Sequence, residues 1–180
     1  MLAFVRTIDS FSDRLGRAVA WLLWAMALLS VSVVALRYVA GIGATSLQEA
    51  VLYLHATLFM VGASYALRHN EHVRVDILNQ RFAPRTRAMV EIGGTLVFLL
   101  PVCGFIFWMS LDYVLASWRI HEVSTDGGLP FVYMLKTLLL VMPVLLALQG
   151  LAELLRNVAF LGGHHPELYP QAQHHEAGEL

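Results

Sequence analysis

The sequence predicts an all-α integral membrane protein with four transmembrane helices, and three observations support this prediction. Hydrophobic residues make up 58% of the 180 residues and charged residues only 14%, whereas a soluble domain carries roughly 25% charged residues. The apolar residues occur in four runs of membrane length. The basic residues gather in segments that would share one side of a membrane.

The four apolar runs define the expected membrane domain, residues 18–160. A hydrocarbon core of about 30 Å needs roughly 20 apolar residues in a helix. The runs that meet this length cover residues 18–39, 47–67, 89–118 and 131–160. The third and fourth are longer than a span needs, which predicts tilt or extension beyond the bilayer. What remains of the chain is too short for a soluble catalytic domain.

Residues 1–17 precede the first span and have an amphipathic pattern. Phe4, Ile8, Phe11 and Leu15 recur with the spacing of one helical face. We therefore expect an interfacial helix that lies on the cytoplasmic membrane surface before the chain turns inward. The apolar run from residue 18 is longer than the 7–15 residues typical of a signal peptide, so we interpret it as a retained span and not as a cleaved leader.

The connection between the second and third spans, residues 69–84, fits two secondary structures. As a helix it has an apolar stripe, and as a strand it has alternating apolar residues. We prefer a short interfacial helix, because an unpaired strand leaves its backbone polar groups unsatisfied. In that helix His72 and Asp76, four residues apart, would be close enough to hydrogen-bond. The polar tail, residues 161–180, is aperiodic and is expected to be disordered.

The basic residues predict the orientation, because Lys and Arg near span ends are retained in the cytoplasm. Nine of the twelve fall in the N-terminal segment, around the connection between spans two and three, or near the end of span four: Arg6, Arg14, Arg17, Arg68, Arg74, Arg81, Arg85, Arg87 and Arg156. Both termini are therefore expected in the cytoplasm, with outer connections at residues 40–46 and 119–130.

Ionisable residues at membrane depth are costly and often functional. Arg37 and Glu49 each lie about one turn below the outer end of the first hairpin. Their matching depth predicts an ion pair, and the alternative is that each side chain reaches the interface separately.

The second hairpin contains two more pairs at matching depth, Asp112 with Lys136 and Glu91 with Arg156. At about 100° per residue, both pairs cannot form between the same two helices unless Pro143 bends the fourth span. At least one of these residues is expected to face a partner subunit or the headgroups.

Several function classes are disfavoured by composition. A net charge of −1 gives no basic patch, so no nucleic-acid partner is expected. The single cysteine excludes an internal disulfide, and His55 is the only histidine within a span, which argues against a haem with two histidine ligands. We expect no catalytic residue, metal site or cofactor, because no nucleophile–base pair or phosphate loop occurs.

Several short motifs follow one another along the chain: Arg37-Tyr38, Gln48-Glu49, the run GASYALR at 62–68, HVRVD at 72–76, Ser117-Trp118, Glu122-Val123-Ser124 and Gly128-Leu129-Pro130. In their order and spacing they resemble the small membrane subunit (DctQ-like) of tripartite ATP-independent periplasmic (TRAP) transporters. The resemblance covers about residues 14–156.

The resemblance implies a non-catalytic partner in a bacterial inner-membrane secondary transporter. In this family a periplasmic substrate-binding protein delivers an organic acid, often a C4-dicarboxylate or sialic acid. A large multi-span permease subunit carries the substrate and sodium sites, and the small subunit is similar to a fixed scaffold. Besides these two proteins, membrane lipid is an expected partner.

Two groups of residues follow as hypotheses from the residues and the resemblance together. Arg37, Glu49, His72, Asp76, Asp112 and Lys136 would maintain the subunit's own structure or its contact with the large subunit. His121, Glu122, Ser124 and Asp126 in the outer loop would contact the docked binding protein.

Two other functions remain open at this stage. The chain could form a small homo-oligomeric exporter that couples transport to protons through Glu49 or Asp112. It could also be an accessory subunit of a redox complex, although no pair of haem ligands supports that role.

Overall fold

The computed structural model describes residues 2–69 and 83–162, and all regular structure in these two ranges is helical. The elements are α1 (Leu2–Val39), α2 (Thr45–Arg68), α4 (Pro84–Gly94), η1 (Thr95–Leu99), α5 (Leu100–Ile120) and α6 (Val132–Leu161). Of the expected surface helix at residues 69–84, which contains His72 and Asp76, only residues 69, 83 and 84 are described, and Pro84 begins α4. Of the expected disordered tail, only residues 161 and 162 are described. The rest of both segments lies outside the described residues.

Four helical stretches are long and apolar enough to cross a membrane: Phe4–Val39, Thr45–Arg68, Pro84–Ile120 and Val132–Leu161. The third combines α4, η1 and α5. This result confirms the all-helical fold with four membrane-length helices. The first and third stretches begin earlier than predicted, at residues 4 and 84 instead of 18 and 89, because polar first turns extend the helices beyond their apolar runs.

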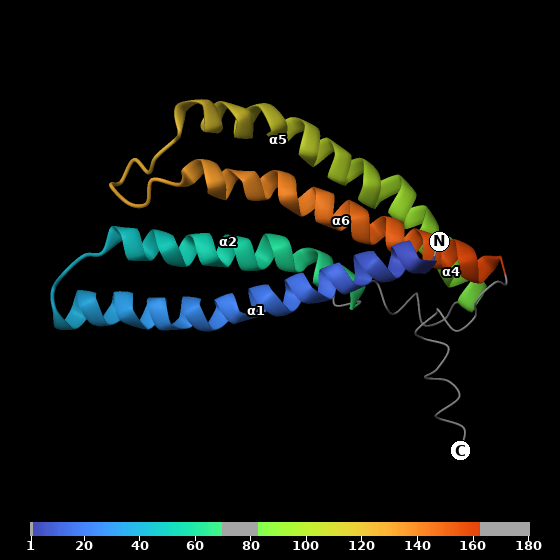
Figure 1. Ribbon diagram of the computed structural model, residues 1–180, viewed down its shortest axis with the longest axis horizontal. Coiled ribbons are helices and arrows are strands. Elements are labelled where there is room, and N and C mark those ends of the chain that lie inside the picture. Colours follow the sequence, from blue (N-terminus) through green and yellow to red (C-terminus); the bar gives the residue numbers. More distant parts are fainter. Residues whose placement is uncertain (1, 70–82, 163–180) are drawn as a thin grey trace, which may run out of the picture.

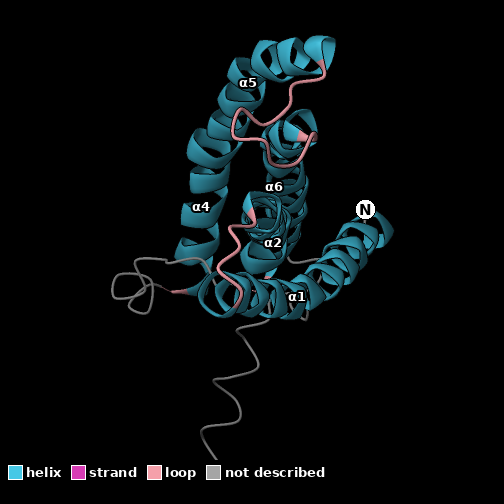
Figure 2. Ribbon diagram, turned by 90° about the vertical axis from the view of Figure 1, so that its left-hand side faces the viewer, coloured by secondary structure: helices cyan, strands magenta, loops and turns pink. Residues whose placement is uncertain are grey.

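The helices form a bent row in the order α5, α6, α2, α1. Helix α6 packs against α5 on one side and α2 on the other, and α2 packs against α1. Figure 2 looks at the ends of the helices and shows this row instead of a closed square. Helix α5 is therefore an edge helix, with most of its surface uncovered.

The row has two ends (Figure 1). We call the end with the α1–α2 and α5–α6 connections, residues 40–44 and 121–131, the hairpin end. The opposite end carries the starts of α1 and α4 and the last turns of α2 and α6, and we call it the terminal end.

Two glycines allow close helix contacts. A side chain at Gly16 of α1 would overlap the Tyr65 ring of α2, and one at Gly150 of α6 would overlap the Leu99 side chain. The contact at Leu99 lies in η1, a π-helical turn in which the Leu100 N–H donates to the Thr95 carbonyl. Pro101 follows immediately and lacks the N–H that an α-helix would need there.

The N-terminal segment differs from its expected form. It is helical, but it continues into the first span as one helix, α1. The residues that α1 buries in this part are Val5, Ile8, Ser12, Gly16 and Val19. Of the predicted stripe of Phe4, Ile8, Phe11 and Leu15, only Ile8 is among them, while Phe4 is 54% exposed and Phe11 49% exposed. Val5 and Ile8 form a small core with Ala152 of α6.

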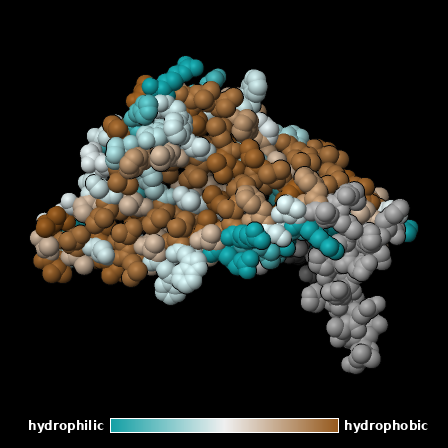
Figure 3. Space-filling view, viewed as in Figure 1, coloured by the Kyte–Doolittle hydropathy of each residue, from teal (hydrophilic) through white to brown (hydrophobic). Residues whose placement is uncertain are grey.

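Most of the apolar surface is uncovered. In no span is more than 22% of the most hydrophobic 18-residue window buried. Apolar side chains cover much of the face in view in Figure 3, and hydrophilic ones gather in separate patches. The fold therefore leaves its helices to be covered by lipid or by another membrane protein.

Candidate functional site

Glu49, in the first turns of α2, joins the two hairpins at the hairpin end. Its carboxylate accepts a hydrogen bond from the Ser124 hydroxyl and another from the Leu129 backbone N–H, the latter at 2.7 Å. A side chain at Gly128 would overlap this carboxylate. The α5–α6 loop is thus held against the start of α2, and Gly128 provides the space for the contact.

A second link joins the loop to α6. The Lys136 ammonium forms an ion pair with the Glu122 carboxylate and lies 4.1 Å from the centroid of the Tyr113 ring. The Glu122 backbone N–H donates to the Ser117 carbonyl at 3.1 Å. The hydrogen bond from Lys136 lowers the pKa of Glu122 below its ordinary value, because it stabilises the ionised carboxylate.

Aromatic side chains complete the hairpin end between α5 and α6. The Trp118 indole N–H donates to the Thr137 hydroxyl at 2.9 Å, and its ring meets Tyr133 edge-on with the centroids 4.7 Å apart. His121 ends α5 in the left-handed conformation, with φ 47°, and its ring also contacts Tyr133. Rings with a polar tip are typical of the membrane interface.

Of the three pairs at matching depth, Arg37 with Glu49 and Asp112 with Lys136 do not form. In the third, Arg156 forms an ion pair with Asp9, and Arg87 lies 3.5 Å from Glu91. Arg37 and Asp112 are exposed, while Glu49 bonds to the loop and Lys136 pairs with Glu122. The residues of each of the first two pairs lie at similar depths, but their side chains project from helix faces that do not meet. Val114 is buried at 2% exposure, and Asp112, two residues earlier, is turned away by about 200°.

The four outer-loop residues predicted to contact a binding protein separate into two kinds. Glu122 and Ser124 direct their side chains into the molecule, toward Lys136 and Glu49. His121 and Asp126 are exposed, and the Asp126 N–H donates to the Ser124 hydroxyl at 3.3 Å. The inward pair fixes the loop, and the outward pair is available at its surface.

The terminal end contains a polar cluster that the sequence interpretation missed. The Asp9 carboxylate of α1 accepts hydrogen bonds from Arg156 at 2.8 Å and from Gln149 at 3.1 Å, both on α6. Arg68 of α2 lies 3.7 Å from the same carboxylate. Asp9 therefore joins three helices, and its two cations are mostly buried, with side chains 23% exposed for Arg68 and 15% for Arg156.

The next polar residues of α1 extend this cluster. The Ser12 hydroxyl donates to the Gln149 side-chain oxygen at 2.7 Å, and Gln149 is fully buried at 0% exposure. Asp13 forms an ion pair with Arg68 and lies 3.1 Å from the His69 ring nitrogen. Asp9, Ser12 and Asp13 follow the i, i+3, i+4 spacing of one helical face, which is the sequence signal that would have found them.

Helix α4 is attached at the same end. The Asn157 side-chain amide of α6 donates to the Glu91 carboxylate at 3.1 Å. Arg87, four residues earlier on α4, lies 3.5 Å from that carboxylate.

Within residues 2–69 and 83–162, no group of three or more His, Cys, Asp or Glu residues is arranged to hold a metal ion.

A family model described as the DctQ component of tripartite ATP-independent periplasmic transporters matches residues 26–160. The chain belongs to the DctQ family. It is therefore a small membrane component of a TRAP transporter. No curated protein and no solved structure matches the chain. The match includes Glu49, Glu122 and Lys136 at the hairpin end, whereas Asp9, Ser12 and Asp13 of the terminal cluster precede it.

Proposed function

We propose that this DctQ-family chain is the fixed scaffold for the large permease subunit of a TRAP transporter in a bacterial inner membrane. The complex would import an organic acid with a sodium gradient after capture by a periplasmic binding protein. The observation that carries this proposal is the open row of helices with at most 22% of any span's most apolar window buried. A row with this much uncovered surface suits a large membrane partner.

The position of the polar residues also supports a scaffold role. A secondary transporter holds its substrate and ions near the bilayer midplane, at polar groups and broken helices. The ion pairs described above lie at the two ends of the row and join its helices to one another. Such contacts stabilise a fixed arrangement of helices, which a scaffold requires.

Asp112 supports a contact with a different protein. It is exposed on α5 and forms no hydrogen bond or ion pair with residues 2–69 or 83–162. On the same face Phe105 is 66% exposed and Trp108 76% exposed. A carboxylate beside apolar side chains favours a basic partner. A parallel two-fold pairing through this face would bring together two Asp112 carboxylates, so the large subunit fits better than a second copy.

The orientation that suits this role has the terminal end in the cytoplasm and the hairpin end in the periplasm. It places nine of the twelve basic residues at or near the cytoplasmic side. His121 and Asp126 are then available to the binding protein, while Glu122 and Ser124 keep the loop in shape. The proposed roles of His72 and Asp76 at the large-subunit contact belong to the same proposal.

Proteoliposomes test this function directly. Vesicles with this chain alone should show no sodium- or proton-driven flux of organic acids. Vesicles that also contain the large subunit should import once the binding protein is added outside. Proton-driven transport by this chain alone would overturn the proposal. Two variants separate the proposed contacts. Asp112→Asn should lower the amount of assembled complex. Asp126→Asn should lower only the effect of the binding protein.

A further inference from the structure

The first turns of α1 separate their charges onto two sides. The acidic residues Asp9 and Asp13 face α2 and α6, where they bind Arg68, Arg156 and the His69 ring. The basic residues Arg6 and Arg14 are exposed and form no hydrogen bond or ion pair with residues 2–69 or 83–162. The outer face of this segment is thus positively charged.

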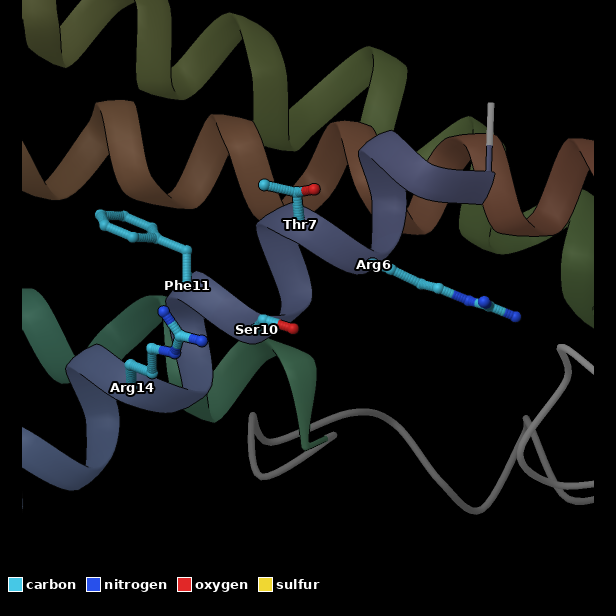
Figure 4. A pocket seen from close by; sticks show the side chains of 5 residues that line it. All are labelled: Arg6, Thr7, Ser10, Phe11 and Arg14. Atoms are coloured by element: carbon cyan, nitrogen blue, oxygen red, sulfur yellow. The ribbon is translucent and has the colours of Figure 1, made fainter.

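This outer face contains a shallow, open pocket of about 400 Å³, lined by Arg6, Thr7, Ser10, Phe11 and Arg14. Figure 4 shows Arg14 and Ser10 on one side of the α1 ribbon, the Phe11 ring projecting from the other side, and Arg6 extending outward one turn before Ser10. A guanidinium group and a hydroxyl therefore lie on the same side of the helix, with a second guanidinium group farther along it and an aromatic ring at its edge. Guanidinium and hydroxyl donors suit phosphate oxygens.

The position of the pocket along α1 suits the membrane interface. The uncharged run of the first span starts at Ala18, one turn after Arg14. Two aromatic rings on the outer part of this segment are about half exposed, Phe4 at 54% and Phe11 at 49%. Positive charge next to exposed aromatic rings, at the edge of an apolar span, is typical of a surface that contacts anionic lipid.

We propose that this outer face of α1 binds an anionic phospholipid, with Arg14 and Ser10 at its phosphate, Arg6 adding positive charge nearby, and Phe11 against its acyl or glycerol part. A free phosphate ion would use Arg14 and Ser10 but would gain nothing from Phe4 and Phe11. The exposed rings therefore favour the lipid. This site does not depend on the scaffold function, because Arg6 and Arg14 take no part in the ion pairs that join α1 to α2 and α6.

Native mass spectrometry of the detergent-purified full chain tests the site with phosphatidylglycerol and phosphatidylcholine of equal acyl chains. We expect phosphatidylglycerol to bind more tightly. The double variant Arg6→Gln/Arg14→Gln should weaken its binding roughly 25-fold, since each basic residue near an anionic lipid surface contributes about fivefold. The matched control is Arg37→Gln/Arg119→Gln, two exposed arginines at or near the hairpin end, which should leave the affinity unchanged.

Three results would overturn the proposal. The first is equal binding of the two lipids, and the second is wild-type affinity in the double glutamine variant. The third is displacement of the lipid by millimolar inorganic phosphate, which would indicate a site for a soluble anion. The competition arm uses the wild-type chain and needs no variant to fold. As a further control, Arg6→Lys/Arg14→Lys keeps both charges and should retain most of the binding, with a modest loss from the missing two-pronged hydrogen bonds.

Discussion

The Glu49 carboxylate accepts a hydrogen bond from the backbone N–H of Leu129, eighty residues later in the chain, at 2.7 Å. Its other oxygen accepts from the Ser124 hydroxyl. Through these two bonds a residue of the first hairpin sets the shape of the loop that closes the second. The loop is therefore part of a fixed surface at the hairpin end.

The effect of replacing Glu49 on stability should depend on whether the new side chain can still hydrogen-bond. Glutamine retains one acceptor for the Leu129 N–H and can donate to the Ser124 hydroxyl, so Glu49→Gln should be nearly neutral. Glu49→Ala leaves both donors unpaired and should cost roughly 1–3 kcal/mol. Thermal unfolding in detergent measures both. Loss of organic-acid uptake in Glu49→Gln with normal stability would instead favour a proton-carrying role.

Gly128→Ala should disturb the same contact from the loop side. The added methyl group would overlap the Glu49 carboxylate, and overpacking of this kind costs about 1–3 kcal/mol. Gly43→Ala is the matched control, because a side chain there meets nothing within 4 Å. Limited proteolysis should cut residues 121–131 faster in Gly128→Ala alone. Equal cleavage of the two variants would argue against the close contact.

The Ser12–Gln149 hydrogen bond should appear as coupling in a double-mutant cycle. Ser12→Ala and Gln149→Leu each remove one partner of a buried bond at 2.7 Å. We expect the double variant to be less destabilised than the sum of the singles, by about 0.6–1.7 kcal/mol, as for polar contacts between membrane helices. Unfolding free energies of the four proteins measure the coupling. Strict additivity would mean that the bond contributes nothing.

Glu122 should make stability depend on pH in the acidic range. Its pKa is lowered by the hydrogen bond from Lys136, so its contribution is complete above the ordinary glutamate pKa of about 4.3. The contribution is lost as the pH falls through the lowered value. The difference in melting temperature between the wild type and Glu122→Gln should therefore shrink on acidification. Asp126→Asn, on the same loop, is the control, and a difference that grows on acidification would contradict the assignment.

Much of the fold was predictable because it depends on periodicity and length along a single helix. Four apolar runs of about 20 residues or more gave four membrane-length helices, and the family motifs around Glu49, Ser117 and Gly128 lie within the matched range. A helix in residues 1–17 was predicted, but its continuation into the first span as the single helix α1 was not, since contacts with α6 help to fix its direction.

The contacts between helices were harder to predict, because depth follows from sequence position but helix rotation does not. Arg37 and Glu49 have matching depth and different faces, and Lys136 pairs with Glu122, fourteen residues away, instead of Asp112. Arg68 was interpreted only as a marker of orientation, and Arg156 also as a residue at the depth of Glu91. Both prove to be the cations that hold Asp9.

The proposed role of this chain is a scaffold for a large membrane partner. Its most direct test is native mass spectrometry of the tagged chain after co-expression with the large permease subunit. A scaffold role predicts a stable complex that contains both subunits. Asp112→Lys should reduce its yield at least fivefold, while Asp126→Lys leaves it intact. A chain that purifies only as a monomer or homo-oligomer, beside a large subunit that transports without it, would contradict the account.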